Sequence, residues 1–324
     1  MSSDKFKNFL ITDSLDGLAT VPKSDLHNHA SNGGNVEFVK KYAGVTIEPP
    51  PALFPSITDM EKWAHANIKK HINKKMRYEA AFTQAKNDGI SVLAMCVFRG
   101  EMDTFGTYAD FIDMFKEMKN TYIPETLFLP EISYLGSSTD DEINYEFSIL
   151  DEILSHHYFT SIELCTDELS QPYVDYKKFS PIFRKAKKHG LKLKAHVGEY
   201  GTADDIMRAV EELELDEVHH GIGAASSPHV MRWLAQHKIQ LNVCPTSNIM
   251  LGRVKSYKDH PIRILYDYGI PITINSDDML IFNQSASQEY MNLYNCGLMS
   301  VDELDAIRKT GLESKSDYIP GGHP

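Results

Sequence analysis

Four short motifs, far apart in the chain, carry imidazole and carboxylate side chains whose types and spacing suit a metal site. They are HNH (27–29), HVGE (196–199), HHG (219–221) and NSDD (275–278). Side chains two residues apart on a strand point to the same face, so His27 and His29 can bind one ion from a single strand end. Imidazole and carboxylate are the usual ligands of a catalytic zinc ion, which keeps one position for water or substrate. His196 and Asp277 would complete such a ligand set.

These motifs can meet only if strands end at one place, and the apolar pattern predicts eight strands that alternate with helices. The predicted strands are 21–27, 90–98, 126–132, 158–165, 191–197, 216–219, 239–243 and 271–275. The predicted helices are 57–88, 106–119, 140–155, 175–189, 203–213, 227–237 and 260–268. This alternation predicts an α/β fold, a (β/α)8 TIM-type barrel with a helical insertion after strand 1.

A doubly wound open sheet would show a similar alternation, but two features favour the barrel. The first strand is not followed by the Gly-rich phosphate loop that such sheets carry. The motif residues also follow the carboxyl ends of strands one, five, six, seven and eight, the face on which (β/α)8 barrels build their active sites. Strands from opposite sides of a sheet converge on one point only when the sheet closes.

Length and composition exclude several classes of protein. The 324 residues show no linker or shift in composition, which predicts a single domain over 1–324. The content of 42% hydrophobic and 24% charged residues is typical of a globular protein with a large buried core. A net charge of −12 without a dense basic cluster argues against nucleic acid as a partner. No apolar run could span a membrane and none marks a signal peptide, so we expect a cytoplasmic protein without a membrane partner.

The segment 33–76 is long for the first strand-to-helix connection of a barrel. Trp63, Ile68 and Ile72 fall roughly on one face of its helical part, which predicts packing over the barrel rim. Part of the segment could also act as a lid that shields the site from water.

The motifs also carry a resemblance to a known family. PKSDLHNH resembles the PK-x-x-LH-x-H of the adenosine deaminase family, and HVGE is similar to its HAGE. EVHHG and NVCPTSN resemble two further segments of that family, and HPIRILYDYGIPITINSDD (260–278) is similar to its helix, strand and acid pair nearly throughout. Five motifs occur in the family's order, and the resemblance covers about 21–320.

The resemblance implies a role for each motif residue. His27, His29, His196 and Asp277 would bind one Zn²⁺ per chain, which would lower the pKa of a bound water. Glu199 would protonate the ring nitrogen beside the carbon under attack. His220 would orient or deprotonate the attacking water. Asp278 would accept a hydrogen bond from the N7 edge of a purine. His219 would point away from the metal, because neighbours on a strand face opposite sides.

Three departures from the family concern the choice of substrate. After HNH the chain reads ASNGG, so Ser31 or Asn32 stands where the adenosine enzymes have an Asp that helps to hold the ribose. A neutral side chain there can still bond a hydroxyl, and it no longer repels a phosphate. Thr166 replaces a Gly beside the purine, and Met279 replaces a Pro after the acid pair. The expected partner is therefore a small-molecule purine nucleoside or nucleotide.

The favoured hypothesis is zinc-dependent hydrolysis of the 6-amino group of adenosine or deoxyadenosine, giving the 6-oxo product and ammonia. AMP, N6-methyl-AMP, adenine, aminodeoxyfutalosine and a pterin are alternative substrates of the same chemistry. A nucleoside-binding protein without activity and a purely structural zinc site are further alternatives. Glu199 and His220 argue against both, since neither alternative needs an acid and an imidazole beside the metal.

Overall fold

Eight parallel strands form one sheet in which each strand pairs with the next along the chain. The computed structural model describes residues 2–168 and 174–314. The strands are β1 (Lys23–Asp25), β2 (Ile90–Phe98), β3 (Leu127–Leu135), β4 (Ser161–Cys165), β5 (Lys192–Val197), β6 (Glu217–His220), β7 (Gln240–Val243) and β8 (Ile272–Ile274). All eight were predicted, and only β3 and β6 run beyond the predicted ends.

The last strand returns to the first, which nearly closes the sheet into a barrel. A parallel bridge joins Asn28 to Asp277, and the Leu26 amide donates to Asn275 Oδ1 at 2.7 Å. The two contacts lie at the carboxyl ends of β1 and β8. They place the first motif beside the last, although some 250 residues separate the two in sequence. The (β/α)8 barrel is confirmed, and the open sheet is not.

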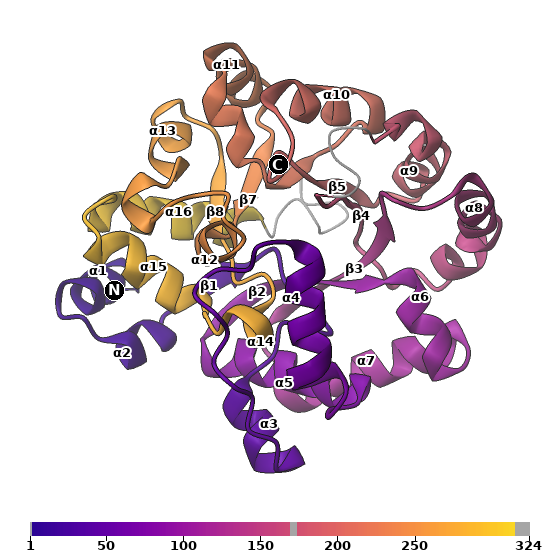
Figure 1. Ribbon diagram of the computed structural model, residues 1–324, viewed down its shortest axis with the longest axis horizontal. Coiled ribbons are helices and arrows are strands. Elements are labelled where there is room, and N and C mark those ends of the chain that lie inside the picture. The colour runs from indigo at the N-terminus through magenta and orange to yellow at the C-terminus, as the bar shows by residue number, and fades with distance from the viewer. Residues whose placement is uncertain (1, 169–173, 315–324) are drawn as a thin grey trace.

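Helices surround the strands in a ring (Figure 1). They include α5 (Lys74–Asn87), α7 (Tyr108–Tyr122), α8 (Asp140–Ser155), α9 (Ser180–Lys188), α10 (Ala203–Leu213), α11 (Pro228–His237) and α13 (Ile262–Asp267). Two more pairs lie beside one another at the left of Figure 1, α1 (Ser2–Ile11) with α2 (Leu15–Ala19) and α15 (Ala286–Asn295) with α16 (Val301–Glu313). The sequence pattern did not predict these four. Gly89, Gly190 and Gly269 follow α5, α9 and α13 with φ of 64°, 80° and 77°, the left-handed conformation that ends many helices.

The insertion after β1 contains several short helices, and the single helix predicted over 57–88 is divided. It holds α3 (Val36–Ala43), α4 (Ile57–Ala64) and a π-helical turn, η1 (His65–Lys69), before α5 begins. The side chain of Ser56 accepts from the Asp59 amide and starts α4. In Figure 1, α4 lies in front of the barrel strands and α3 lies at the lower edge of the view.

The insertion has its own hydrophobic core against the rim of the barrel. Ile68 and Ile72 are buried there with Leu280 and Phe282 of α14 (Met279–Phe282), and Trp63 packs against them half-buried. The predicted packing over the rim is confirmed, and the lid remains a hypothesis. Among the described residues, no helix is both long and apolar enough to cross a membrane.

Candidate metal centre and active site

The carboxyl ends of β1, β5, β6 and β8 bring the motif residues to one point inside the barrel mouth. His27 Nε2 and His29 Nε2 lie 3.5 Å and 3.3 Å from the same Asp277 oxygen, Oδ1. The other oxygen, Oδ2, is 3.8 Å from His220 Nε2. The His196 ring lies 4.5 Å from the His27 ring, centroid to centroid. All five side chains are buried.

Two of these residues have backbone conformations that side chains rarely adopt. His220 has φ of 62° and Asp277 has φ of 57°. Such strain persists only where the surrounding structure holds it, and it is frequent at functional sites. The turn at His220 also breaks the strand alternation, so both His219 and His220 face the barrel interior. His219 was expected to point away from the metal. That expectation is wrong, because the His219 ring stacks on the ring of the candidate ligand His27, with centroids 4.0 Å apart.

The donor groups fit a metal ion. Neither ring nitrogen of His27 has a hydrogen-bond partner among the described residues, an arrangement that is costly for a buried imidazole unless it binds an ion. Two ligand atoms that each lie about 2.1 Å from one ion in a tetrahedral site are roughly 3.4 Å apart. The two distances to Asp277 Oδ1 agree with that separation. Ligand atoms of His27, His196 and His220 also lie within 4.8 Å of one another.

Two partners of the candidate ligands were not foreseen from the sequence. Glu163, buried on β4, places Oε2 3.1 Å from His196 Nδ1, and this leaves His196 Nε2 as the nitrogen available to an ion. Cys96 Sγ lies 3.2 Å from His29 Nδ1, and this contact leaves His29 Nε2 as the nitrogen available to an ion. Such outer partners orient metal-binding imidazoles. The available signal was an acid in the middle of an apolar strand, SIELC.

Below Glu163 the barrel interior contains further charges. The same Glu163 oxygen lies 3.1 Å from His219 Nε2, which is 3.3 Å from Glu131 Oε1. Lys194 Nζ is 2.8 Å from Glu131 Oε2 and 3.5 Å from Glu217 Oε2. A series of buried ion pairs therefore lies beneath the candidate ligands. Of the residues in it, only His219 belongs to the four motifs HNH, HVGE, HHG and NSDD.

Burial changes the protonation of the acids and the imidazole beside the candidate ligands. Burial, reinforced by the charge of Asp277, raises the pKa of Glu199 to about 8. Burial also raises the pKa of Asp278. It lowers the pKa of His220 to about 3, against the opposing effect of Asp277. At pH 7 Glu199 is therefore mostly protonated and the imidazole is neutral, while Asp278, with a pKa of about 7, is protonated in about half of the molecules. Such shifted pKa values are typical of acid and base roles in active sites.

These residues open into a pocket of about 340 Å³, within the usual range for small-molecule sites. Its polar wall includes His29, His196, Glu199, His220 and Asp278. Apolar side chains from the barrel rim and the insertion also line the pocket: Ile57, Met60, Phe98, Leu135, Leu251 and Phe282. Such a mixed lining suits a heterocycle with a polar edge.

The three departures from the family occupy different places. Asn32 lines the pocket, and its buried Oδ1 has no hydrogen-bond partner among the described residues. Ser31 is buried but does not line the pocket. Thr166 lines it, and its hydroxyl donates to the carbonyl of His196. Met279 begins α14, which packs under the insertion. Asn32 is thus the residue of this group best placed to contact a ligand.

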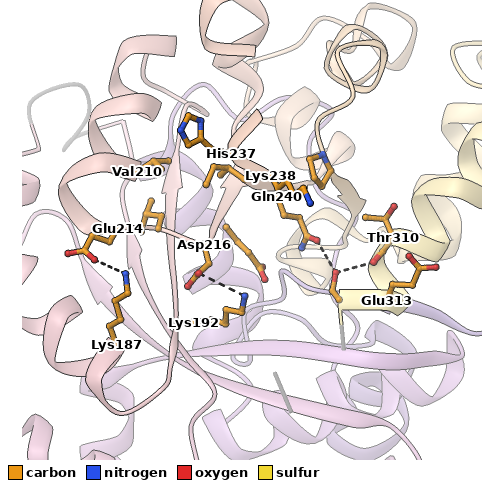
Figure 2. Close-up of a pocket in the computed structure, with 15 residues that line it drawn as sticks. Lys187, Lys192, Val210, Glu214, Asp216, His237, Lys238, Gln240, Thr310 and Glu313 are labelled. Atoms are coloured by element: carbon orange, nitrogen blue, oxygen red, sulfur yellow. Dashed lines mark hydrogen bonds and ion pairs between the residues drawn. The ribbon is translucent and has the colours of Figure 1, made fainter. Parts of the chain in front are cut away.

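A larger hollow of about 720 Å³ lies at the other end of the barrel (Figure 2). Lys192 and Gln240 open β5 and β7 there. Its charges are mostly paired, with Lys187 Nζ 2.6 Å from Glu214 and Lys192 Nζ 3.9 Å from Asp216. It contains none of the motif residues, and barrel enzymes act at the opposite face. The smaller pocket is therefore the candidate active site.

Known proteins are similar to this chain in sequence and in fold. A protein of Treponema pallidum (strain Nichols), provisionally assigned as an adenosine/adenine deaminase, is 30% identical over 91% of this chain and 98% of its own. The structure of adenine deaminase from Arthrobacter aurescens superimposes with a TM-score of 0.75 at 21% identity, over 90% of this chain and 93% of that one. An amidohydrolase from Burkholderia ambifaria with bound Zn gives 0.70 at 17% identity, over 91% and 86%.

The model of the family described as adenosine deaminase matches residues 141–319, more than half of the chain. That range contains three of the four motifs, and the Treponema relative extends the match to nearly the whole length. The protein is therefore an enzyme, a hydrolytic aminohydrolase of the adenosine or adenine deaminase type, and the chain belongs to the adenosine deaminase family.

Proposed function

We propose that this chain, as a single domain over 1–324, hydrolyses the 6-amino group of a purine nucleoside, adenosine or deoxyadenosine, with one zinc ion held by His27, His29, His196 and Asp277. Residues 169–173 and 315–324 of that domain lie outside the described part. One observation carries the proposal: two acids whose pKa values are raised by burial face the same pocket as a cluster of imidazoles and a carboxylate. When bound, zinc lowers the pKa of a water toward neutrality.

Glu199 is the proposed proton donor to the substrate. Its pKa of about 8 keeps it protonated at neutral pH, and it lines the pocket beside His196 and His220. Protonation of the ring nitrogen next to C6 makes that carbon electrophilic and leaves Glu199 as a carboxylate. That carboxylate can accept a proton from the attacking water and pass it to the departing amine, and the second proton of the water restores the acid. His220, neutral and next to Asp277, is placed to contact the attacking oxygen.

Asp278 is proposed to hold the N7 edge of the purine by donating a hydrogen bond to it. The sequence-based expectation had Asp278 as the acceptor. N7 of a nucleoside has a lone pair and no hydrogen, so it can only accept. The raised pKa of Asp278 supplies the donor, because a protonated carboxyl carries an O–H. Its Oδ1 is buried without a hydrogen-bond partner among the described residues.

The pocket favours an uncharged substituent over a phosphate. Glu61 and Asp167 line it, and the pocket-lining Lys69 is already 2.6 Å from Glu61. Asn32 offers a neutral acceptor suited to a hydroxyl. Adenine is the second candidate, supported by the likeness to the Arthrobacter adenine deaminase. AMP and N6-methyl-AMP rank below both, since a phosphate would meet two carboxylates.

The test is ammonia release by the zinc-loaded protein from adenosine, deoxyadenosine, adenine, AMP, N6-methyl-AMP, aminodeoxyfutalosine and a pterin. We expect the highest kcat/KM with adenosine or deoxyadenosine. A kcat/KM that is highest with AMP would show that the pocket does not favour an uncharged substituent over a phosphate. No ammonia from any purine would overturn the proposed reaction.

Glu199→Gln tests the proton donor within the same assay. The amide has the same shape but cannot shuttle a proton, so turnover should be lost while zinc content stays at one per chain. Glu168→Gln is the control, because Glu168 lies nearby and contacts the Ile57 amide rather than the metal cluster. Persistent turnover in Glu199→Gln would exclude Glu199 as the donor.

A further inference from the structure

Asn248 occupies the point where the proposed proton donor meets the active-site imidazole. It lies on α12 (Pro245–Met250), directly after β7, and is fully buried. Its side chain reaches three groups: Glu199, His220 and His260. We propose that Asn248 and His260 form a positioning relay that fixes the carboxyl of Glu199 and places the proton of His220 on Nε2. The proposal rests on the roles proposed above for Glu199 and His220.

The relay begins at a backbone amide, which fixes the first proton. His260 is buried, and its Nδ1 lies 3.1 Å from the amide nitrogen of Ile262. An amide N–H can only donate, so Nδ1 must accept and cannot carry a hydrogen. Burial lowers the pKa of His260 to about 3, so the ring is neutral. Its single proton is therefore on Nε2.

The position of that proton then orients the Asn248 amide. His260 Nε2 lies 3.3 Å from Asn248 Oδ1 and donates to it. With the oxygen held by His260, the amide nitrogen must face the active site. The geometry matches, since Asn248 Nδ2 is 3.0 Å from Glu199 Oε1 and 3.1 Å from His220 Nδ1. Each of its two hydrogens has one acceptor.

The position of the ring proton distinguishes two roles for His220. Because Asn248 Nδ2 can only donate, His220 Nδ1 accepts and the ring proton is on Nε2, the nitrogen that faces Asp277. A neutral imidazole with hydrogen on Nε2 can donate to the attacking oxygen and orient it, but has no lone pair there to remove a proton. Asn248 also leaves the second oxygen of Glu199 to carry the transferable proton. Asn248 and His260 are positioning residues, since neither lines the pocket.

The first test needs no change to the relay. In the zinc-loaded protein labelled with ¹⁵N-histidine, long-range ¹⁵N–¹H spectra distinguish the two neutral tautomers, and the His220 signals are assigned by their loss in His220→Gln. We expect hydrogen on Nε2 in both His220 and His260. Hydrogen on Nδ1 of His220 would overturn the relay, whether or not the protein deaminates a purine. Failure of the proposed function would appear in the ammonia assay alone.

Two pairs of variants test the consequence for turnover. Asn248→Asp keeps the size but loses both donor hydrogens, and kcat should fall on the order of 10–100-fold, as for other residues that orient active-site groups, with KM within about threefold and zinc retained. Asn292→Asp is the matched control, since that amide donates to Tyr257 outside the pocket. His260→Gln, which can still donate to Asn248, should keep more activity than His260→Phe. Equal activity in the His260 pair, or Asn248→Asp within threefold of wild type, would contradict the proposal.

Discussion

The barrel interior contains two layers of charged side chains, and they differ in the source of their positive charge. In the lower layer, defined by Glu131, Lys194, Glu217 and His219, a lysine lies between two carboxylates. In the upper layer, defined by His27, His29, His196 and Asp277, the carboxylate faces only imidazoles. Within residues 2–168 and 174–314, no lysine or arginine forms an ion pair with Asp277.

The difference supports the upper layer as the proposed site of a cation. Burial acts to raise the pKa of Glu131, but Lys194 and His219 outweigh it and hold that pKa below its usual value. The lower layer is therefore balanced by its own residues. Burial acts to lower the pKa of His29, but Asp278 and Asp277 outweigh it and raise that pKa to about 10. The upper layer therefore has its donor atoms directed at one point and, among the described residues, only a titratable imidazole as its positive charge. Glu163 connects the layers, 3.1 Å from His196 above and 3.1 Å from His219 below.

The largest effect should come from the upper layer. Asp277→Asn removes the one carboxylate of the proposed ligand set, so zinc should be lost to a mild chelator and turnover should fall by more than the roughly 100-fold typical of losing an outer partner. Metal analysis and ammonia release measure both. Asp278→Asn is the control and should keep zinc while losing activity. If Asp277→Asn kept its zinc, the ligand assignment would be wrong.

In the lower layer the large effect should be on stability. Lys194→Met leaves Glu131 and Glu217 buried without their cation, which should reduce the free energy of unfolding by about 3–5 kcal/mol. Lys192→Met, which removes the more exposed pair with Asp216, should cost less than about 1 kcal/mol. Urea unfolding of both variants makes the comparison. Equal losses would show that the lower layer is not held by its lysine.

The link between the layers should affect metal affinity. Glu163→Gln loses the charged acceptor of His196 Nδ1, and zinc affinity should fall about 10–100-fold in a chelator competition. Glu131→Gln should change it less, since Glu131 contacts Lys194 and His219 but no proposed ligand. The same loss in both variants would mean that total charge, rather than the contact with His196, controls affinity.

The smallest expected effect is a dependence of stability on pH at Glu199. Its ordinary pKa of 4.5 applies to the unfolded chain, and burial and Asp277 raise it to about 8 in the folded metal-free protein, while Arg253 opposes the rise. Between these values the folded state binds more protons, so wild-type stability falls as pH rises. Glu199→Gln removes this dependence on pH. Between pH 6 and pH 8 its free energy of unfolding should therefore rise, relative to that of wild type, by on the order of 1 kcal/mol. Urea unfolding of the metal-free proteins measures it, and parallel profiles would exclude the raised pKa.

The sequence predicted the parts of this molecule that depend on local pattern. Each of the eight strands was recognisable because a buried parallel strand is an apolar run. His27, His29, Glu199 and Asp277 were predicted to lie together because barrel active sites are built at strand ends, and the structure brings them to one pocket region, while their roles stay predictions. The helix predicted over 57–88 was wrong in detail, since short-range periodicity does not show that packing on α14 divides it.

The missed residues depend on pairing across the barrel. Glu163, Lys194 and Glu131 come from three different strands, and only the register of those strands brings their charges together. Asn248 lies in a recognised motif, CPTSN, but its contacts involve Glu199 and His260, which are 49 and 12 residues away. The orientation of His219 was wrong because the positive φ of His220 breaks the alternation that sequence reasoning assumes.

The central claim is that deamination depends on one metal ion in the upper layer. The most direct measurement is ammonia release from adenosine as zinc is added in steps to the metal-free protein. We expect no turnover without metal, a linear rise and a plateau at one zinc per chain. Full turnover by the metal-free protein would contradict it, as would a rise that continues to two zinc ions per chain.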